Sequence, residues 1–480
     1  MIFKIAGRKH EIALMQKALQ SPEAGLLAMY GRRRIGKTYL IERIYAENIV
    51  FEIIGMHRAT IRQQLTNFAI SLSDKTKEPA ITIPENWLEA FKDLKAYLIK
   101  QPKETKQVVF FDEFPWLDGK RSGFLAAFEH FWNSWACRQP HMLVVICGSA
   151  ASWMIKKVTH NKGGLYNRIT QSIRLLPFTL AETADFLKQR NINLSLFEIT
   201  QLYMCMGGIP HYLKEVEEGM SAAQVIDKLA FKKDGLLTKE FQFLYPALFD
   251  NAENHETIVR ALATKKSGLT RQQLVELIPI ESGGSLTTWL FDLEESGFIE
   301  KYRPFSKKQK ESLYRLSDEY SLFYLKFIEG VGSTGEVNWL SLAQSATWKS
   351  WAGYAFEGIC LKHTHAIKNA LGISGLTTTQ SSWWYRGSAN DTGAQVDMLI
   401  DRPDNTINMM EIKYANSPFT ITKNYAEEIR NKIQVFSRVT HTRKNVFCCM
   451  IAPWGVEKNE HYLGLVQQHL TLEDLFEESR

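Results

Sequence analysis

The stretch LLAMYGRRRIGKT, residues 26–38, decides the fold of the N-terminal part of the chain. An apolar run ends at Gly31, and after four more residues Gly36, Lys37 and Thr38 lead into a helical pattern. A strand, a glycine-containing turn and a helix in this order build a phosphate-binding loop, whose backbone N–H groups surround phosphate oxygens. We therefore predict an ATP site in which Lys37 reaches the β- and γ-phosphates and the Thr38 hydroxyl binds Mg²⁺. Gly31, Gly36 and the following Tyr39 are expected to contact the nucleotide as well.

Two acidic residues end a second apolar run, VVFFDE, at residues 108–113. Carboxylates at the end of a buried strand are costly unless they have partners. In ATP hydrolysis, one acid holds the Mg²⁺ shell and another positions and activates the attacking water. We assign the first role to Asp112 and the second to Glu113; the alternative is a solvated turn that happens to begin with these two acids.

Apolar runs alternate with helical patterns over residues 1 to about 175, which predicts a parallel α/β sheet. The runs cover residues 26–30, 49–54, 108–111, 142–147 and 173–178. From residue 180 to about 249 the apolar spacing is helical, with a break at residues 207–210. This spacing predicts a small helical subdomain.

Residues 250–320 have the element order of a winged helix. Three helical segments precede two strands, at residues 255–263, 270–277, 285–295, 298–303 and 312–316. A Gly/Ser-rich boundary at residues 329–335 leads into a second α/β region. We thus expect four domains, at residues 1–178, 179–249, 250–328 and 336–480.

The composition agrees with a multidomain globular protein. The 480 residues are 45% hydrophobic and 23% charged, and the formal charge of +6 is only a weak indication of a nucleic-acid partner. No apolar stretch approaches the ~20 residues that cross a bilayer, so we expect a cytoplasmic protein with no membrane partner. The six cysteines form no CxxC pair, which favours buried reduced thiols. Cys448 and Cys449 should point to opposite faces of one strand.

A second set of catalytic residue types lies near the C-terminus. One expected strand, residues 394–400, carries Asp397, and the next, residues 407–414, carries Glu411 and Lys413. Two acids on neighbouring strands can hold one Mg²⁺ or Mn²⁺, and a lysine on the same face can orient the attacking water. Glu357, in a helical pattern upstream, would complete the metal shell. The alternative is a strand face that carries an ordinary salt bridge.

Several motifs resemble the archaeal branch of the AAA+- and STAND-related ATPases. They are GRRRIGKT, VVFFDEFPWL, CGSAASWM, GGIPHYL and an opening Gly7-Arg8-x-x-Glu11. The resemblance implies an ASCE-type sheet with strand order 5-1-4-3-2 and a helical lid. It also implies that Ser149 is the polar residue that ends the sensor strand, near the γ-phosphate.

The same resemblance implies residues around the base of the nucleotide. Gly207 to Pro210 would form a lid motif against the base, and Gly7, Arg8 and Glu11 would border the adenine. Arg168 matches the family position of an arginine finger, and an ion pair with a surface acid is an equally good interpretation. We interpret Arg32 to Arg34 as part loop geometry and part solvated surface.

The D-(x)13-E-x-K pattern of Asp397, Glu411 and Lys413 resembles the PD-(D/E)XK nucleases, which implies a restriction-endonuclease-like α/β domain. Gln395 stands where many members of that superfamily have an acid, which puts full activity in doubt.

The winged helix carries charges of both signs. Its third helix contains Asp292, Glu294 and Glu295, which would repel DNA phosphates. The wing is basic, with Arg303, Lys307, Lys308, Lys310 and Arg315. Contact with DNA without strong sequence specificity and a role as spacer between domains remain equal alternatives.

The leading hypothesis is therefore an ATP-hydrolysing enzyme whose ATPase domain is coupled to a metal-dependent DNA nuclease domain. The alternative is a STAND-like switch, in which slow ATP turnover gates a partner and the C-terminal domain only binds nucleic acid or that partner. An arginine finger that acts in trans would require a homo-oligomer.

Overall fold

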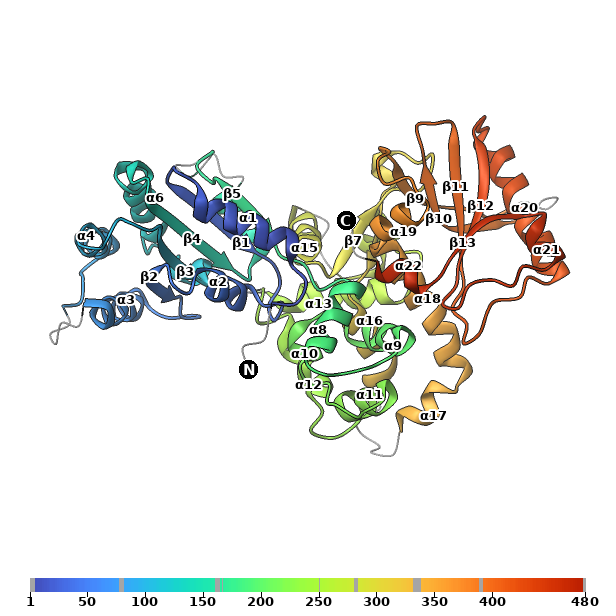
Figure 1. Cartoon of the computed structure of the whole chain (residues 1–480), viewed down its shortest axis with the longest axis horizontal. Helices are drawn as coiled ribbons and strands as arrows, with labels where there is room; N and C mark the ends of the chain where they lie inside the picture. Colours follow the sequence, from blue (N-terminus) through green and yellow to red (C-terminus); the bar gives the residue numbers. More distant parts are fainter. Residues whose placement is uncertain are drawn as a thin grey trace.

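The structure is a computed structural model that describes residues 5–76, 82–159, 165, 167–249, 251–279, 284–330, 338–387 and 392–477. Residues 331–335 of the expected boundary, and Gly163, Gly164 and Tyr166 before Arg168, lie outside these residues. Figure 1 shows an N-terminal sheet, a central group of helices and a C-terminal sheet, with a short hairpin between the two sheets.

The N-terminal sheet has five parallel strands. They are β1 (Gly25–Tyr30), β2 (Ile49–Ile54), β3 (Gln107–Asp112), β4 (Met142–Gly148) and β5 (Gln171–Arg174). Their order, β2-β3-β4-β1-β5, confirms the expected order 5-1-4-3-2. The expected strand at 173–178 is wrong in its bounds, because β5 pairs with β1 only up to Arg174. Beyond it, the N–H of Phe178 donates to the carbonyl of Gly208 at 2.7 Å instead.

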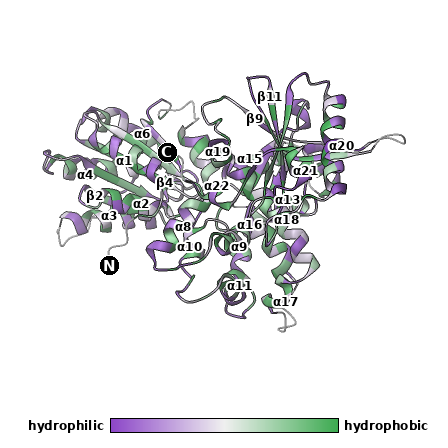
Figure 2. Cartoon of the chain, turned by 45° about the vertical axis from the view of Figure 1, so that its right-hand side comes forward, coloured by the Kyte–Doolittle hydropathy of each residue, from purple (hydrophilic) through white to green (hydrophobic). Residues whose placement is uncertain are grey.

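Helices cover both faces of this sheet. On one face lie α1 (Lys9–Gln20) and α2 (Lys37–Tyr45); on the other lie α3 (Ile61–Thr76), α4 (Trp87–Ile99) and α6 (Phe124–Ser134). Strands covered on both sides need continuous apolar runs, and β3 and β4 are buried along their whole length. The central strands of this sheet are hydrophobic in Figure 2. Short helices follow β3 and β4, at α5 (Phe114–Leu117) and α7 (Ala151–Met154).

The central region is helical, as predicted. Its helices are α8 (Leu180–Gln189), α9 (Leu196–Met206), α10 (Pro210–Leu213), α11 (Ala222–Ala230) and α12 (Leu236–Leu244). Capping boxes begin α8, α9 and α11, at Thr179, Ser195 and Ser221. The expected break separates α9 from α10. Gly208 is required there, since a Cβ atom would lie 1.9 Å from the carbonyl oxygen of Phe178.

The next region contains the expected three helices and hairpin. Its elements are α13 (Ala252–Ala263), β6 (Leu269–Thr270), α14 (Arg271–Leu277), α15 (Gly284–Glu295), β7 (Ile299–Tyr302) and β8 (Leu313–Leu316). The short strand β6, which was not expected, joins the hairpin in an antiparallel sheet of order β6-β8-β7. Helix α16 (Glu319–Phe323) follows directly.

The third helix of this region, α15, lies against the N-terminal region. Lys156 Nζ is 2.9 Å from a carboxylate oxygen of Asp292, and Arg174 donates to the carbonyls of Glu294 and Glu295 at 2.9 Å. The carboxylate of Glu295 lies 3.4 Å from Arg174 as well. Two of the acids that we expected to repel DNA, Asp292 and Glu295, are therefore engaged in contacts between two regions of the chain.

The C-terminal sheet is mixed, in the order β13-β12-β11-β10-β9. Its strands are β9 (Thr379–Tyr385), β10 (Ala394–Asp401), β11 (Thr406–Ile412), β12 (Asn445–Ile451) and β13 (Val466–Leu470). Residues of α18 (Ala346–Lys362), α19 (Thr364–Ala370) and α22 (Leu472–Phe476) pack on one face, and α20 (Lys423–Thr440) packs on the other. Short helices α17 (Trp339–Ala343) and α21 (Glu460–Leu463) complete this region.

The two adjacent cysteines of β12 lie as the sequence predicts. All six cysteines are free, and Cys448 and Cys449 pack into core clusters on opposite faces of the C-terminal sheet, as predicted. Within the described ranges, none of the helices is both long enough and apolar enough to span a bilayer.

Candidate functional site

The phosphate loop takes the shape that its glycines allow. Gly31 has φ 152°, and a Cβ atom there would lie 2.2 Å from the carbonyl oxygen of Leu175. Gly36 has φ 88° and precedes the first turn of α2. Lys37 is 6% exposed, and its Nζ donates to the carbonyls of Gly31 and Arg32 at 2.9 Å each and to Ser149 Oγ at 3.1 Å. The loop thus encloses its own lysine at the carboxyl end of β1.

The acids at the end of β3 join the same hydrogen-bonded group. Thr38 Oγ1 donates to Asp112 Oδ2 at 2.7 Å, and the N–H of Glu113 donates to Asp112 Oδ1 at 2.9 Å. Ser149 Oγ donates to Glu113 Oε1 at 2.6 Å. Because β1, β3 and β4 are parallel, their carboxyl ends meet, and the five residues expected at the phosphates lie together. The hydroxyl of Thr38 and the carboxylate of Asp112 are the oxygen ligands that suit Mg²⁺.

A pocket of about 410 Å³ lies beside the phosphate loop. Its lining includes Arg8, Ile35, Gly36, Tyr39, Phe178 and Pro210. The Arg8 guanidinium lies over the Phe178 ring at 4.5 Å, and Glu11 is 3.9 Å from Arg8. Of the residues expected around the base, Arg8 and Pro210 line this pocket, whereas Gly7, Glu11 and residues 207–209 are not part of its lining.

The lid motif also places a histidine at this pocket. The N–H of His211 donates to the carbonyl of Arg34 at 3.4 Å. Burial and the charge of Arg34 lower the pKa of His211 to about 4. Its ring is therefore neutral at pH 7 and adds no positive charge to the pocket.

A comparison with protein families agrees with this geometry. Residues 5–216 match the model of a family described as an ATPase domain predominantly from Archaea. This part of the chain is an archaeal-type P-loop ATPase domain. An uncharacterised protein of Methanocaldococcus jannaschii is 24% identical over 396 residues, which cover 80% of this chain and 82% of that protein.

Solved structures with similar folds have low sequence identity. The Walker-type ATPase of Pyrococcus abyssi is 19% identical, with a TM-score of 0.48 over 67% of this chain and 96% of that one. The ORC2 protein of Aeropyrum pernix is 15% identical, with a TM-score of 0.40 over 68% of this chain and 95% of that one.

Arg168 stands apart from the other residues expected at the phosphates. It lies in an exposed turn before β5. Among the described residues, no hydrogen bond or ion pair joins its side chain to the phosphate loop, Asp112 or Glu113. Its side chain therefore does not belong to the hydrogen-bonded group of this ATPase domain.

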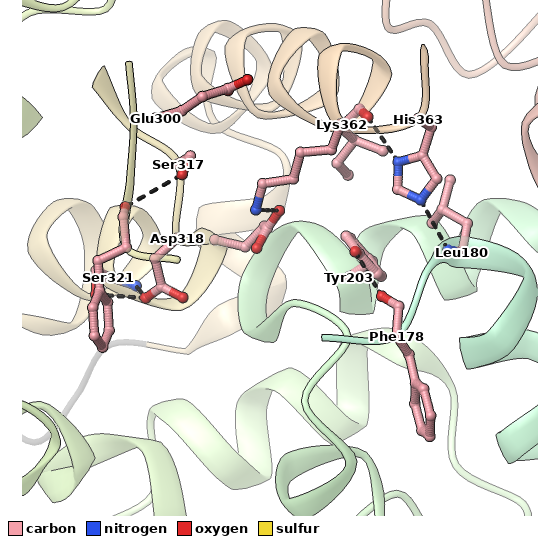
Figure 3. A network of polar contacts seen from close by, with 12 residues as sticks. Phe178, Leu180, Tyr203, Glu300, Ser317, Asp318, Ser321, Lys362 and His363 are labelled. Carbon is pink, nitrogen blue, oxygen red and sulfur yellow. Dashed lines mark hydrogen bonds and ion pairs between the residues drawn. The ribbon is translucent and has the colours of Figure 1, made fainter. Parts of the chain in front are cut away.

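The expectation for the arginines of the loop is wrong for Arg32. Its side chain is only 3% exposed and forms an ion pair with Asp318, which is 2% exposed and caps α16. Asp318 also accepts from Ser321 N at 2.9 Å and Ser321 Oγ at 2.6 Å, as Figure 3 shows. The guanidinium lies over the Phe298 ring at 4.6 Å. The distance between Arg32 and Asp318 along the chain concealed this contact in the sequence.

Two partners stabilise the charge of Asp318. Burial alone would raise the pKa of this carboxyl, but the Arg32 charge and the Ser321 hydrogen bonds hold it below its usual value. The same burial would lower the pKa of Arg32, which the Asp318 charge raises. Arg34 forms a second ion pair out of the loop, with Glu240 of α12. The ATPase domain is therefore held to the helical region and to α16 through its phosphate loop.

In the C-terminal sheet, Glu411 is fully buried and has cationic and phenolic partners. Lys432 Nζ lies 3.0 and 2.9 Å from its two oxygens, and the Tyr425 hydroxyl donates to Oε2 at 2.9 Å. Lys413 Nζ is 4.0 Å from the same carboxylate. Reasoning from the sequence missed Lys432 and Tyr425, which α20 supplies.

Asp397 and Glu357 face each other from β10 and α18. The register of β10 and β11 pairs Met398 with Met410, so that Asp397 and Glu411 occupy adjacent positions. A β-bulge lies between Val396 and Leu399, and bulges of this kind re-aim side chains next to active sites. Burial and the charge of Glu411 raise the pKa of Asp397 to about 6, and burial and the charge of Asp397 raise the pKa of Glu357 to about 7.

A divalent cation beside Asp397 and Glu357 would relieve the repulsion by which the charge of Asp397 raises the pKa of Glu357. Within the described parts of the chain, however, no group of three or more His, Cys, Asp or Glu side chains is arranged to hold a metal ion. Glu411 points to Lys432 and Tyr425 of α20, whereas Glu357 comes from α18 on the other face of the sheet. The predicted set of three acidic ligands is thus not assembled around one point here.

The expected basic wing is docked rather than free. Arg315 is 9% exposed and donates to Glu300 at 2.6 Å, and the N–H of Phe305 donates to the carbonyl of Ser382 in β9 at 2.9 Å. Exposed cations remain in this loop, at Arg303, Lys307, Lys308 and Lys310.

Proposed function

We propose that this protein is an ATP-hydrolysing, DNA-processing enzyme in which the ATPase domain controls a metal-dependent nuclease-like C-terminal domain. The observation that carries the proposal is the group of Asp397 and Glu411 on adjacent strands, with Lys413 directly after β11 and Glu357 in the same cavity lining as Asp397. Lys413 Nζ lies 4.0 Å from Glu411 Oε2, and the pKa of Asp397 is raised to about 6. Perturbed acids beside a lysine are typical of functional sites.

In the ATPase domain, each residue of the group has one task. Lys37 neutralises the β- and γ-phosphates, and Thr38 and Asp112 hold Mg²⁺. Glu113 accepts a proton from the attacking water, and Ser149 orients Glu113 through the 2.6 Å hydrogen bond. The pocket lined by Arg8, Tyr39 and Pro210 takes the adenine.

In the C-terminal domain, Asp397 and Glu357 would hold Mg²⁺ or Mn²⁺, and Glu411, whose oxygens Lys432 binds in this structure, would be the third ligand. The ion would polarise a phosphodiester as a Lewis acid. Lys413 orients the attacking water. Gln395, which lines the same cavity as Asp397, contributes no charge.

The region between the two sites is a winged helix that acts as a connector. We assign the ATPase domain to residues 1–178, the lid to 179–249, the winged helix to 250–328 and the nuclease-like domain to 336–480. The contacts of α15 with Lys156 and Arg174, and of Phe305 with β9, support the connecting role. The exposed Arg303, Lys307, Lys308 and Lys310 supply DNA contact without sequence preference.

The test incubates the full-length protein with Mg²⁺ or Mn²⁺ and labelled single- and double-stranded DNA and RNA, with and without ATP. Lys37→Ala and Asp397→Ala are tested in parallel. Cleavage that is lost in Asp397→Ala and altered in Lys37→Ala supports the proposal. Cleavage that survives Asp397→Ala refutes the assignment of the site.

A second function, a nucleotide-gated switch whose C-terminal domain only binds, is favoured by one observation. Lys432 and Tyr425 hold both oxygens of Glu411 in a site that is fully buried. If ATP is hydrolysed and no polynucleotide is cleaved under any metal condition, the switch is the correct function.

The exposed Arg168 is proposed as a finger that acts on a neighbouring copy in a homo-oligomer. Size-exclusion chromatography with light scattering, combined with ATPase rates at several protein concentrations, tests this role. A monomer whose ATPase rate per molecule is high and independent of concentration excludes it.

A further inference from the structure

A large cavity lies between the three-stranded sheet and the C-terminal sheet. Its volume is about 930 Å³, and its wall combines β6, β7 and β8 with α18, β9 and β10. The hydrogen bond from Phe305 N to the carbonyl of Ser382 holds the two parts together at one side. Figure 1 shows β7 and β9 near each other in this part of the molecule. The cavity is thus built by two regions that are separate in the sequence.

Aromatic rings and cations line this cavity. The aromatic side chains include Tyr302, Tyr354 and Trp384, and each is partly exposed. Lys266 Nζ lies over the Tyr354 ring at 5.4 Å and, through its charge, lowers the pKa of Glu357. Lys266 is exposed and comes from the turn before β6, so that a cation of one region faces the acid pair of the other.

The charges of the wall fall into two groups. Arg315 pairs with Glu300, and Lys307 is 3.4 Å from Glu311, so that these four charges cancel locally. The cations Lys265, Lys266 and Arg386 and the acids Glu357 and Asp397 then remain on the lining.

We propose that this cavity binds a single polynucleotide strand and presents its backbone to Asp397 and Glu357. Bases stack on the aromatic rings, and the backbone phosphates lie near Lys265, Lys266 and Arg386. This arrangement of rings and cations is the one that binds single strands without reading sequence. The inference rests on the proposed function, because it names the substrate of the same acid pair.

The size of the cavity favours an unpaired strand over a duplex. A sphere of 930 Å³ would be about 12 Å across, as wide as the major groove of B-DNA and narrower than the duplex itself. We therefore expect unpaired nucleotides to reach the acid pair on the lining more readily than paired ones.

The test measures binding separately from cleavage. Fluorescence anisotropy follows labelled oligo-dT and oligo-U of 12 nucleotides, and a blunt 12-base-pair duplex, bound to the full-length protein in EDTA without ATP. Trp384→Ala should weaken single-strand binding about 5- to 150-fold, the loss given by one base–aromatic stack. Lys266→Ala should reduce the slope of log K against log[salt] by about 0.7. The oligo-dT and oligo-U results identify whether the strand is DNA or RNA.

Two variants serve as matched controls. Trp454 is 48% exposed and Lys458 is exposed, and both lie outside the cavity lining, so Trp454→Ala and Lys458→Ala should bind like the wild type. Circular dichroism and Tm check the folding of each variant. If Trp384→Ala does not fold, the salt slope of Lys266→Ala alone decides.

The inference is overturned if the duplex binds as tightly as the single strands, if no oligonucleotide binds, or if Trp384→Ala and Lys266→Ala match their controls. If single strands bind in EDTA but are not cleaved in Mg²⁺ or Mn²⁺, the cavity is upheld as a binding site and the nuclease activity is refuted. If the protein cleaves a polynucleotide but its cavity variants bind like the wild type, the nuclease is upheld and the cavity is refuted as the binding site.

Discussion

The buried pair of Arg32 and Asp318 should make a large contribution to the coupling of the ATPase domain to α16. Substituting Asp318→Asn leaves the Arg32 guanidinium in a site that is 3% exposed with no counter-charge. At contact distance and an effective dielectric constant near 20, two unit charges interact by about 4–5 kcal/mol. Removal of one partner from a buried pair costs about 3–5 kcal/mol. We therefore expect Asp318→Asn to lower the free energy of unfolding by about 3–5 kcal/mol.

A double-mutant cycle separates the pair from its surroundings. Asp318→Asn, Arg32→Met and the double variant are unfolded in urea and followed by near-UV circular dichroism. The double variant should be more stable than the sum of the single changes implies, because it contains no unpaired charge. Glu217→Gln is the control, since its pair with Lys228 is exposed and should contribute no more than about 1 kcal/mol.

Two results would refute this reasoning. If Asp318→Asn costs less than about 1 kcal/mol, the pair is hydrated or formed differently in solution. If the effects of the single variants simply add, the two side chains do not interact. In either case the interpretation of Arg32 as a solvated surface residue would be correct.

Three further predictions concern packing, pH and the C-terminal acids. Gly208→Ala should destabilise the protein by about 3 kcal/mol, because the added Cβ would lie 1.9 Å from a backbone oxygen. Gly353→Ala is the control, since the added Cβ has open space in α18 and should stabilise the protein slightly. Urea unfolding measures both changes. Burial lowers the pKa of His363 to about 4, below its unfolded value near 6.5, so the unfolded state takes up the proton first as the pH falls. The free energy of unfolding should thus fall by up to about 3 kcal/mol between pH 6.5 and pH 4. The difference in this free energy between the wild type and His363→Gln should change with pH by the same amount. A difference that stays constant with pH would contradict the prediction. Lys432→Ala should lower the free energy of unfolding by about 3 kcal/mol at pH 7, because it leaves the buried Glu411 carboxylate with Tyr425 and the more distant Lys413. A loss under about 1 kcal/mol would contradict this reasoning.

Local patterns account for the parts that the sequence predicted well. The phosphate loop and the acids after β3 depend on a strand, a turn and a helix that are consecutive in the chain. Parallel pairing then brings Lys37, Thr38, Asp112, Glu113 and Ser149 together without any further information. The helices of the lid follow from apolar spacing and capping boxes in the same way.

The parts that were missed depend on contacts between distant residues. Arg32 and Asp318 are separated by 286 positions, and an arginine in a loop gives no local sign of burial. Glu411 is bound by Lys432 of α20, whose position on the far face of the sheet is set by packing. The prediction extended β5 to Phe178 because this residue is apolar. In the structure, the N–H of Phe178 donates to the carbonyl of Gly208 and not to a neighbouring strand.

Two consecutive acids at the start of α16, Asp318 and Glu319, contact different regions of the chain. Asp318 pairs with Arg32, whose carbonyl accepts from Lys37 at 2.9 Å, and Glu319 lies 2.5 Å from Lys362 at the end of α18. Figure 3 shows Asp318 and Lys362 on the two sides of this network. Glu357 lies on the same helix as Lys362.

The lid reaches the same point. A Cβ atom on Gly207 would lie 3.0 Å from Oε2 of Glu319, so the lid motif packs directly against this acid. Asp318 and Glu319 are both nearly buried, and breaking such a pair on one side costs several kcal/mol. A continuous series of contacts therefore joins Lys37 of the phosphate loop, through Arg32 and the consecutive acids Asp318 and Glu319, to Lys362 at the end of α18.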